Sequence, residues 1–384
     1  MKRILIPVIL CLIVFKVNAQ EEQEPRRVIT TAVPFVLIAA DARAAGMGDM
    51  GVGTSVDGFS QQWNPAKYAF STYKQGVGVT YTPYLSKLVN DIFLGNLTYF
   101  NRLNERSAVA ASFRYFSLGD IELRETADQE PLIQSPNELT LDVSYSLRLS
   151  DRFSMAVAGR YLRSDLKLQV ADEDATAGSS FAVDIAGYYQ SEELTFNEFD
   201  GRWRMGFNFS NLGPKIKYDD VGQENFLPTN LALGGGFDFI LDAFNRVGVT
   251  AEVNKLLVPT PPVRDEDGNV IRGQDDDVTF FKGVFQSFGD APDGFSEELK
   301  EFTWALGAEY SYQDSFFLRT GYFNESEEKG SRKFLSLGAG FKYTSINIDV
   351  SYLFSTSNVR SPLEGTLRFG LTFNFGDSDY YVEY

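Results

Sequence analysis

Apolar and polar residues alternate along most of the chain beyond residue 75. In the clearest stretch, every second position from 139 to 149 is apolar and the positions between them are polar. Successive side chains of a strand point to opposite faces, so this alternation predicts a strand with one apolar and one polar face. Most such segments are close to the ~9–11 residues that a tilted strand needs to cross a bilayer.

The alternation predicts fourteen strands. They begin near residues 76, 91, 107, 137, 153, 179, 201, 230, 245, 302, 315, 333, 345 and 365. Short and long connections alternate between them, apart from one of middling length near 191–200. Outer-membrane barrels have this asymmetry, with short periplasmic turns and longer outward loops. We therefore expect an all-β fold, a 14-stranded antiparallel transmembrane barrel over residues 76–375 with a tail at 376–384 and both mature termini in the periplasm.

A secreted β-sandwich is the main alternative, because its strands also alternate and are also separated by turn signals. The strand lengths, the aromatic residues near strand ends and the loop asymmetry favour the barrel. A closed barrel is also the β architecture that pairs every backbone group within lipid.

The N-terminal region does not follow the strand pattern. Lys2 and Arg3 precede an apolar run from Ile4 to Phe15, and Ala19 closes a small-residue cleavage site. This predicts a signal peptide over residues 1–19 and export from the cytoplasm. Residues 20–75 are rich in Ala and Gly, which favours a segment packed inside the barrel as a plug over a periplasmic tail.

Composition excludes several chemistries. The 384 residues include no His and a single Cys, Cys11, which lies within the predicted signal peptide. Catalytic Ser-His-Asp sets and His-ligated zinc are therefore excluded. The formal net charge of −17 argues against a nucleic-acid partner. We expect no cofactor, and we expect the charged residues of the inner face to pair with one another and with the plug.

Two local patterns have competing interpretations. Residues 265–269 and 275–277 carry the oxygens of a calcium loop without the full EF-hand spacing, so a solvated acidic loop is the alternative. Gly234, Gly235 and Gly236 lie within a strand and are not followed by Gly-Lys-Ser/Thr. They predict a bend or bulge rather than a phosphate loop.

Two motifs in the plug resemble a known family. Residues 41–49 read Asp-Ala-Arg-Ala-Ala-Gly-Met-Gly-Asp, and Trp63 is followed by Asn64, Pro65 and Ala66. Together they resemble the N-terminus of the PorV proteins of the type IX secretion system, relatives of the FadL-type fatty-acid channels. This resemblance implies a FadL-like barrel whose N-terminal hatch fills the lumen. We expect the Asn-Pro-Ala triplet to form a structural turn.

The resemblance also implies a non-enzymatic function in the outer membrane of a Gram-negative cell. PorV proteins bind an SprA-type translocon, receive cargo with a C-terminal type IX signal, and deliver it to a PorU-type sortase complex. The alternative is a FadL-type transporter of long-chain fatty acids or other hydrophobic small molecules. Both would sit among outer-membrane lipid.

The longest predicted connection, residues 256–301, is the candidate partner-binding loop. Connections of this length usually have a function. Its aromatic residues are Phe280, Phe281, Phe285 and Phe288. Clustered exposed aromatics usually mark an interface, whereas the alternative is that these side chains fold back and cap the barrel mouth.

Overall fold

The structure is a computed structural model that describes residues 27–124, 128, 130–166, 177–218, 223–357 and 360–377. The predicted signal peptide and most of the predicted C-terminal tail lie outside the described residues. Among the described residues, no helix is long and apolar enough to cross a membrane.

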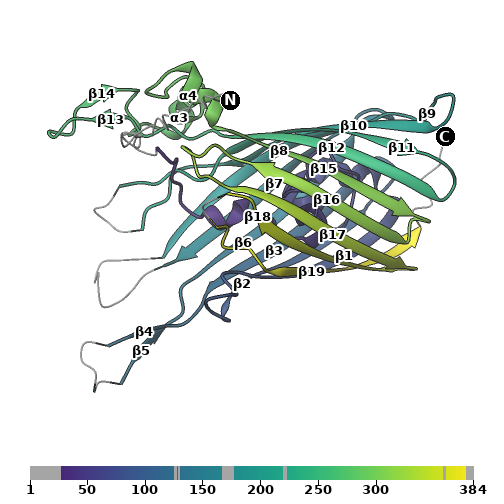
Figure 1. Ribbon diagram of the computed structural model, residues 1–384, viewed down its shortest axis with the longest axis horizontal. Coiled ribbons are helices and arrows are strands. Elements are labelled where there is room, and N and C mark those ends of the chain that lie inside the picture. The colour runs from purple at the N-terminus through teal and green to yellow at the C-terminus, as the bar shows by residue number, and fades with distance from the viewer. Residues whose placement is uncertain are drawn as a thin grey trace, which may run out of the picture.

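Fourteen long antiparallel strands of the described chain form a closed barrel (Figure 1). The strands are β1 (Tyr73–Pro83), β2 (Ile92–Arg102), β3 (Ser107–Leu118), β6 (Asn137–Arg148), β7 (Phe153–Asp165), β8 (Gly178–Gln190), β10 (Asp200–Leu212), β11 (Asn230–Ile240), β12 (Asn245–Leu256), β15 (Phe302–Tyr312), β16 (Phe316–Asn324), β17 (Lys333–Tyr343), β18 (Ile346–Ser355) and β19 (Leu367–Asp377). Each pairs with its neighbour along the chain, and β19 pairs with β1 to close the ring. The predicted fold is confirmed, and every strand begins within three residues of its predicted start.

The connections define two ends of the barrel. One end carries the short turns, for example 103–106 and 344–345, and the other carries the long loops. By the usual asymmetry of outer-membrane barrels, the long-loop end is the outer end. Small elements decorate the connections: β4 (Ile121–Leu123) with β5 (Leu132–Gln134), β9 (Leu194–Thr195), β13 (Val263–Arg264) with β14 (Val270–Arg272), α3 (Phe280–Gln286) and α4 (Phe295–Lys300).

The barrel wall is apolar outside and polar inside. On β6, Leu141 and Val143 are about half exposed on the outer face, whereas the inward side chains of Thr140 and Asp142 are buried. A soluble protein would bury the apolar set instead. This inverted arrangement suits a barrel whose outer face contacts lipid.

The plug lies inside the barrel and follows its inner wall. Its elements are η1 (Pro34–Leu37), α1 (Ala42–Ala45), α2 (Ser60–Trp63) and η2 (Pro65–Phe70). The helix α1 contacts β17, β18 and β19, and η2 contacts β3, β6, β7 and β8 on the other side of the lumen. The plug is therefore held from several directions.

Glycines let the plug backbone lie flush against the wall. A Cβ atom on Gly234 would lie 2.7 Å from the backbone nitrogen of Gly53, and one on Gly53 would lie equally close to Gly234. Strand β11 stays paired with both β10 and β12 through this region. No bulge interrupts β11 here, so that part of the prediction is wrong, and the glycines of β11 make room for the plug.

The two ends of the described chain lie at opposite ends of the barrel (Figure 1). Asp377 pairs with Tyr73 at the short-turn end, as expected for the C-terminus. Arg27 instead contacts Asp293 and Glu297 in the longest outer loop. The described chain therefore enters the plug from the outer mouth, while the predicted mature terminus at residue 20 lies outside the described residues.

Candidate functional site

The Asn-Pro-Ala triplet fastens the plug to the barrel wall. The Asn64 side chain accepts a hydrogen bond from the Ala66 amide at 3.1 Å, and Pro65 occupies the first position of η2. The Asn64 amide nitrogen donates to the Gly187 carbonyl of β8 at 2.9 Å and to the Val52 carbonyl at 3.1 Å. The structure therefore places one fully buried Asn at the joint between two plug segments and the wall.

Charged residues of the plug pair with charged residues of the inner wall. Arg43 forms ion pairs with Asp57 of the plug at 2.7 Å and with Glu309 of β15 at 2.9 Å. Arg368 of β19 pairs with Asp49 of the plug at 2.9 Å. The expected pairing of inner-face charges with the plug is confirmed at these positions.

The longest connection, residues 257–301, forms a structured outer arm that we call the docking loop. It contains β13, β14, α3 and α4, beside the start of the described chain (Figure 1). Phe281, Phe285 and Phe288 are 73%, 76% and 51% exposed. Phe280 is half-buried, and its ring centroid lies 5.1 Å from that of Phe281. Phe281 and Phe285 therefore project into solvent, whereas the Phe288 ring centroid lies 6.0 Å from the Nζ of Lys255 at the base of the loop.

The helix α4 extends the apolar surface that the sequence interpretation had limited to four residues. Phe295 is 76% exposed and Leu299 is also exposed. A helix as short as α4 shows no clear apolar periodicity among the surrounding carboxylates. Sequence reasoning therefore misses these two residues.

A buried ion network holds the base of the docking loop to the barrel rim. Lys255, at the end of β12, contacts Glu301 at 2.6 Å and Glu298 at 3.2 Å. Lys329, in the loop between β16 and β17, contacts Glu297 at 2.6 Å and Glu301 at 2.9 Å. All five residues are buried. Such pairing offsets much of the cost of burying charged groups.

The start of the plug joins the same network. Arg27 donates to both carboxylate oxygens of Glu297 at 2.9 Å and also pairs with Asp293. Burial alone would raise the pKa of Glu297, but the hydrogen bonds from Arg27 and Lys329 outweigh it and lower the pKa to about 2. We call the set Arg27, Lys255, Glu297, Glu298, Glu301 and Lys329 the loop clamp. Sequence reasoning missed it because its members are as many as 302 positions apart, between 27 and 329.

The acidic turn of the docking loop is internally bonded. The Asp265 carboxylate accepts hydrogen bonds from the backbone amides of Asp267 and Asn269, at 3.1 and 2.8 Å. Within the described ranges, no group of three or more His, Cys, Asp or Glu residues is arranged to hold a metal ion. The arrangement is that of a self-capped turn.

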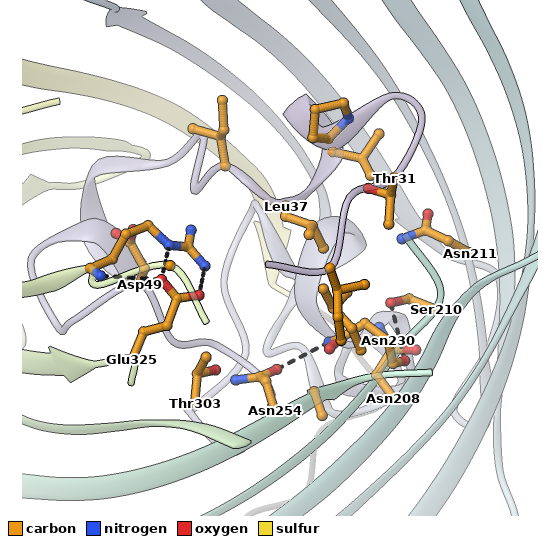
Figure 2. Close-up of a pocket in the computed structure, with 18 of the residues that line it drawn as sticks. Thr31, Leu37, Asp49, Asn208, Ser210, Asn211, Asn230, Asn254, Thr303 and Glu325 are labelled. Atoms are coloured by element: carbon orange, nitrogen blue, oxygen red, sulfur yellow. Dashed lines mark hydrogen bonds and ion pairs between the residues drawn. The ribbon is translucent and has the colours of Figure 1, made fainter. Parts of the chain in front are cut away.

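An outer cavity of about 480 Å³ lies between the plug and the inner wall of the barrel, with Glu301 of the docking loop at its edge. One wall is apolar and comes from the plug segment 28–38, which we call the strap. The facing wall is polar and comes from adjacent strands, which also contribute Glu252 of β12, whose carboxylate accepts a hydrogen bond from the Asn254 side chain at 3.3 Å. We call this polar wall the amide wall, and it consists of Asn208, Ser210, Asn230, Asn254 and Thr303. Figure 2 shows these side chains along one side of the cavity, with Thr31 and Leu37 of the strap nearby.

The amide wall follows the register of β10, β11, β12 and β15. Asn208 lies opposite Ala232, which lies opposite Asn254, which in turn lies opposite Thr303. The Asn230 side chain donates to that of Asn254 at 3.1 Å. Sequence reasoning missed this cavity because neighbouring strands bring together residues that are scattered over almost a hundred positions.

Comparisons with known proteins identify one family and one fold. A family model described as "Type IX secretion system protein PorV" matches residues 20–263. Among solved structures, the chain resembles the CymD monoaromatic hydrocarbon channel at 13% identity, covering 90% of this chain and 99% of that one with a TM-score of 0.50. It also resembles a Pseudomonas aeruginosa FadL homologue at 12% identity, covering 88% and 98% with a TM-score of 0.47. No curated protein matches the chain.

Proposed function

The chain belongs to the PorV family of type IX secretion system proteins, and we propose that it is the outer-membrane adaptor that shuttles cargo in this system. In this proposal it binds an SprA-type translocon and receives cargo that carries the C-terminal secretion signal. It then hands the cargo to a PorU-type sortase complex at the cell surface. The function is non-enzymatic, because the covalent chemistry belongs to the sortase partner.

The exposed apolar face of the docking loop is the observation that carries this proposal. Phe281, Phe285 and Phe295 are each about three-quarters exposed on short helices. The loop clamp fixes the base from which these helices project. Aromatic anchors within a polar frame are typical of protein interfaces, so the loop is suited to hold a partner protein.

The charge of the docking loop indicates what kind of surface it fits. Residues 257–301 include four basic and eleven acidic residues. A partner groove with apolar floor and basic rim would complement it, and such complementarity sets orientation and association rate more than affinity.

Trimming the docking loop tests the proposal. Residues 264–294 are replaced by a short Gly/Ser turn, which leaves the Glu residues of the loop clamp in place. We expect the barrel to insert and fold, but no longer to co-purify with the translocon in mild detergent, and cargo to fail to reach the surface. A parallel trim of the β4–β5 hairpin, residues 121–134, serves as the control and should retain the translocon. A docking-loop variant that still co-purifies and secretes would contradict the proposal and move the interface to 117–136 or 211–229.

A second candidate is a FadL-type transporter of fatty acids or other hydrophobic small molecules. The apolar strap wall of the outer cavity favours it, since a small-molecule site needs such a surface. Transport predicts that uptake of a labelled long-chain fatty acid depends on the protein and survives trimming of the docking loop. Adaptor function predicts that uptake does not depend on the protein and that secretion, not uptake, is lost when the docking loop is trimmed.

A further inference from the structure

We infer that the outer cavity binds the carboxyl end of an extended polypeptide, with the terminal carboxylate on Arg114 and the peptide groups on the amide wall. This inference rests on the proposed function, because it names the part of a cargo protein that the barrel itself would hold. It adds a site distinct from the docking loop, which contacts the partner instead.

Arg114 is a buried cation with unused hydrogen-bonding capacity on this cavity. It lies on β3, is 2% exposed and lines the cavity. Its Nη1 donates to the Val36 carbonyl of the strap at 3.0 Å, whereas its Nε has no hydrogen-bond partner. No carboxylate in the described part of the chain forms an ion pair with it.

The nearest acidic side chains are already engaged. Asp142 and Asp184 both pair with Arg160. Asp142 also accepts from the Ser112 hydroxyl at 3.0 Å, and Asp184 from the Asn211 amide at 2.7 Å. A guanidinium group presents five donors in a planar fork that matches a carboxylate. A ligand carboxylate would therefore supply the partner that the protein does not.

The amide wall favours a peptide over an acyl chain. Asn side chains offer both a donor and an acceptor, as peptide groups do. The Oδ1 of Asn208 is buried without a partner, and its row continues through Asn254 and Thr303 on strands spaced about 4.8 Å apart. An acyl chain laid on this wall would desolvate these groups without pairing them, which is costly.

The shape of the cavity favours a chain end. Its outer side is lined by loop residues Glu301, Lys329 and Gly330, and its inner side by Val52 and Trp63 of the plug. A volume of about 480 Å³ suits a ligand of drug-like size. The last few residues of a chain fit this volume, whereas a doubled-back loop does not. Apolar side chains of the incoming segment would face Val36 and Leu37 of the strap.

Binding of short peptides to the full-length protein in lipid nanodiscs tests the inference. The probes are the tetrapeptide acetyl-Ala-Val-Thr-Val with a free carboxylate, the same peptide as its C-terminal amide, and dodecanoate. We expect the free acid to bind about tenfold more tightly than the amide, since a charge-assisted pair is lost in the amide. Arg114→Gln should remove this preference. Arg148→Gln, at the short-turn end where Arg148 donates to the Asp151 carbonyl, is the matched control and should keep it.

A second variant protects the test against a loosened plug, because Arg114 also holds the Val36 carbonyl. Ala232→Leu fills the cavity between Asn208 and Asn254 and should abolish binding of both peptides. Equal binding of acid and amide, no peptide binding, or binding of dodecanoate that neither peptide displaces would each overturn the inference. Translocon co-purification, measured on the same preparations, stays intact in those cases if the proposed function is right, whereas trimming the docking loop removes it.

Discussion

The plug and the docking loop are both held by buried ion pairs, but they expose opposite faces. The plug turns its Arg, Asp and Asn side chains toward the wall and buries its apolar residues, so the described plug surface is engaged on several sides. The docking loop is tied at its base through the loop clamp and further out by an ion pair between Asp277 and Lys215 of the β10–β11 connection. It leaves Phe281, Phe285 and Phe295 in solvent.

This difference separates a part built to stay in place from a part built to be covered. Backbone contacts as close as that of Gly53 with Gly234 leave the plug no room to shift without losing wall contacts. The docking loop is less constrained. Its apolar face loses solvent-exposed area when a partner covers it, which favours binding. Both parts meet at Arg27, the first described residue, which contacts the loop through Glu297.

Among the variants of plug and docking loop, Arg43→Met should have the largest effect, which is on the stability of the plug. Arg43→Met leaves Asp57 without its Arg partner and removes one of the two Arg partners of Glu309. Breaking a buried pair from one side typically costs about 3–5 kcal/mol. We expect faster hydrogen exchange across residues 41–70 in the assembled barrel, with translocon binding retained. Arg43→Lys keeps the charge and should show a smaller change. Unchanged exchange in the Met variant would mean that the plug is held chiefly by packing.

Asn64→Ala should have the next largest effect. It removes the cap on Ala66 and leaves the Gly187 and Val52 carbonyls without this donor. An N-cap contributes about 1 kcal/mol, and each buried group left unpaired costs about 1–3 kcal/mol. We expect lower barrel stability or assembly, seen as a lower unfolding temperature, with the same co-purifying partners. A variant that assembles normally and yet no longer releases cargo would give the motif a mechanistic function instead.

The docking loop should respond to pH through two carboxyl groups whose pKa values are shifted in opposite directions. The pKa of Glu297 is lowered to about 2. Its ionised form therefore stabilises the folded loop at pH values above the usual pKa of 4.5, and that stabilisation is lost as the pH falls toward 2. Burial instead raises the pKa of Asp290 to about 6, so its ionisation destabilises the loop as the pH rises from 3.8 through 6.

These opposite signs predict greatest protection of α4 near pH 4, because stabilisation by Glu297 levels off toward 4.5 while ionisation of Asp290 already destabilises the loop above 3.8. Hydrogen exchange of the α4 amides, corrected for the intrinsic effect of pH, measures this protection. Asp290→Asn should flatten the change between about pH 4 and 6 and leave the loss below pH 4.5 in place. A loop whose protection rises steadily to pH 7 would show that the loop clamp does not control it.

The sequence predicts the barrel far better than the plug path or the loop clamp, for physical reasons. Alternation on β6 is local, and lipid on one side enforces it at every second residue. The outer start of the plug depends on Arg27 meeting Glu297, 270 positions away, which leaves no periodic signal. Gly234 could be recognised as unusual, but its reason lies in the backbone of Gly53 and not in its own strand.

The smallest effect on stability should come from the residues with the largest effect on partner binding. Phe281 and Phe285 are 73% and 76% exposed, so Ser at both positions removes little buried area. Surface substitutions of this kind usually change stability by less than about 0.5 kcal/mol. We expect an unchanged unfolding temperature and a clear loss of translocon co-purification, because exposed aromatic anchors act only once a partner covers them.

Phe244→Ser, at an exposed short turn on the opposite end of the barrel, is the matched control and should change neither measurement. If the double variant destabilises the barrel, the aromatic face packs within the protein and the contrast between plug and loop is wrong. If stability and binding are both unchanged, the docking surface lies elsewhere on the outer end.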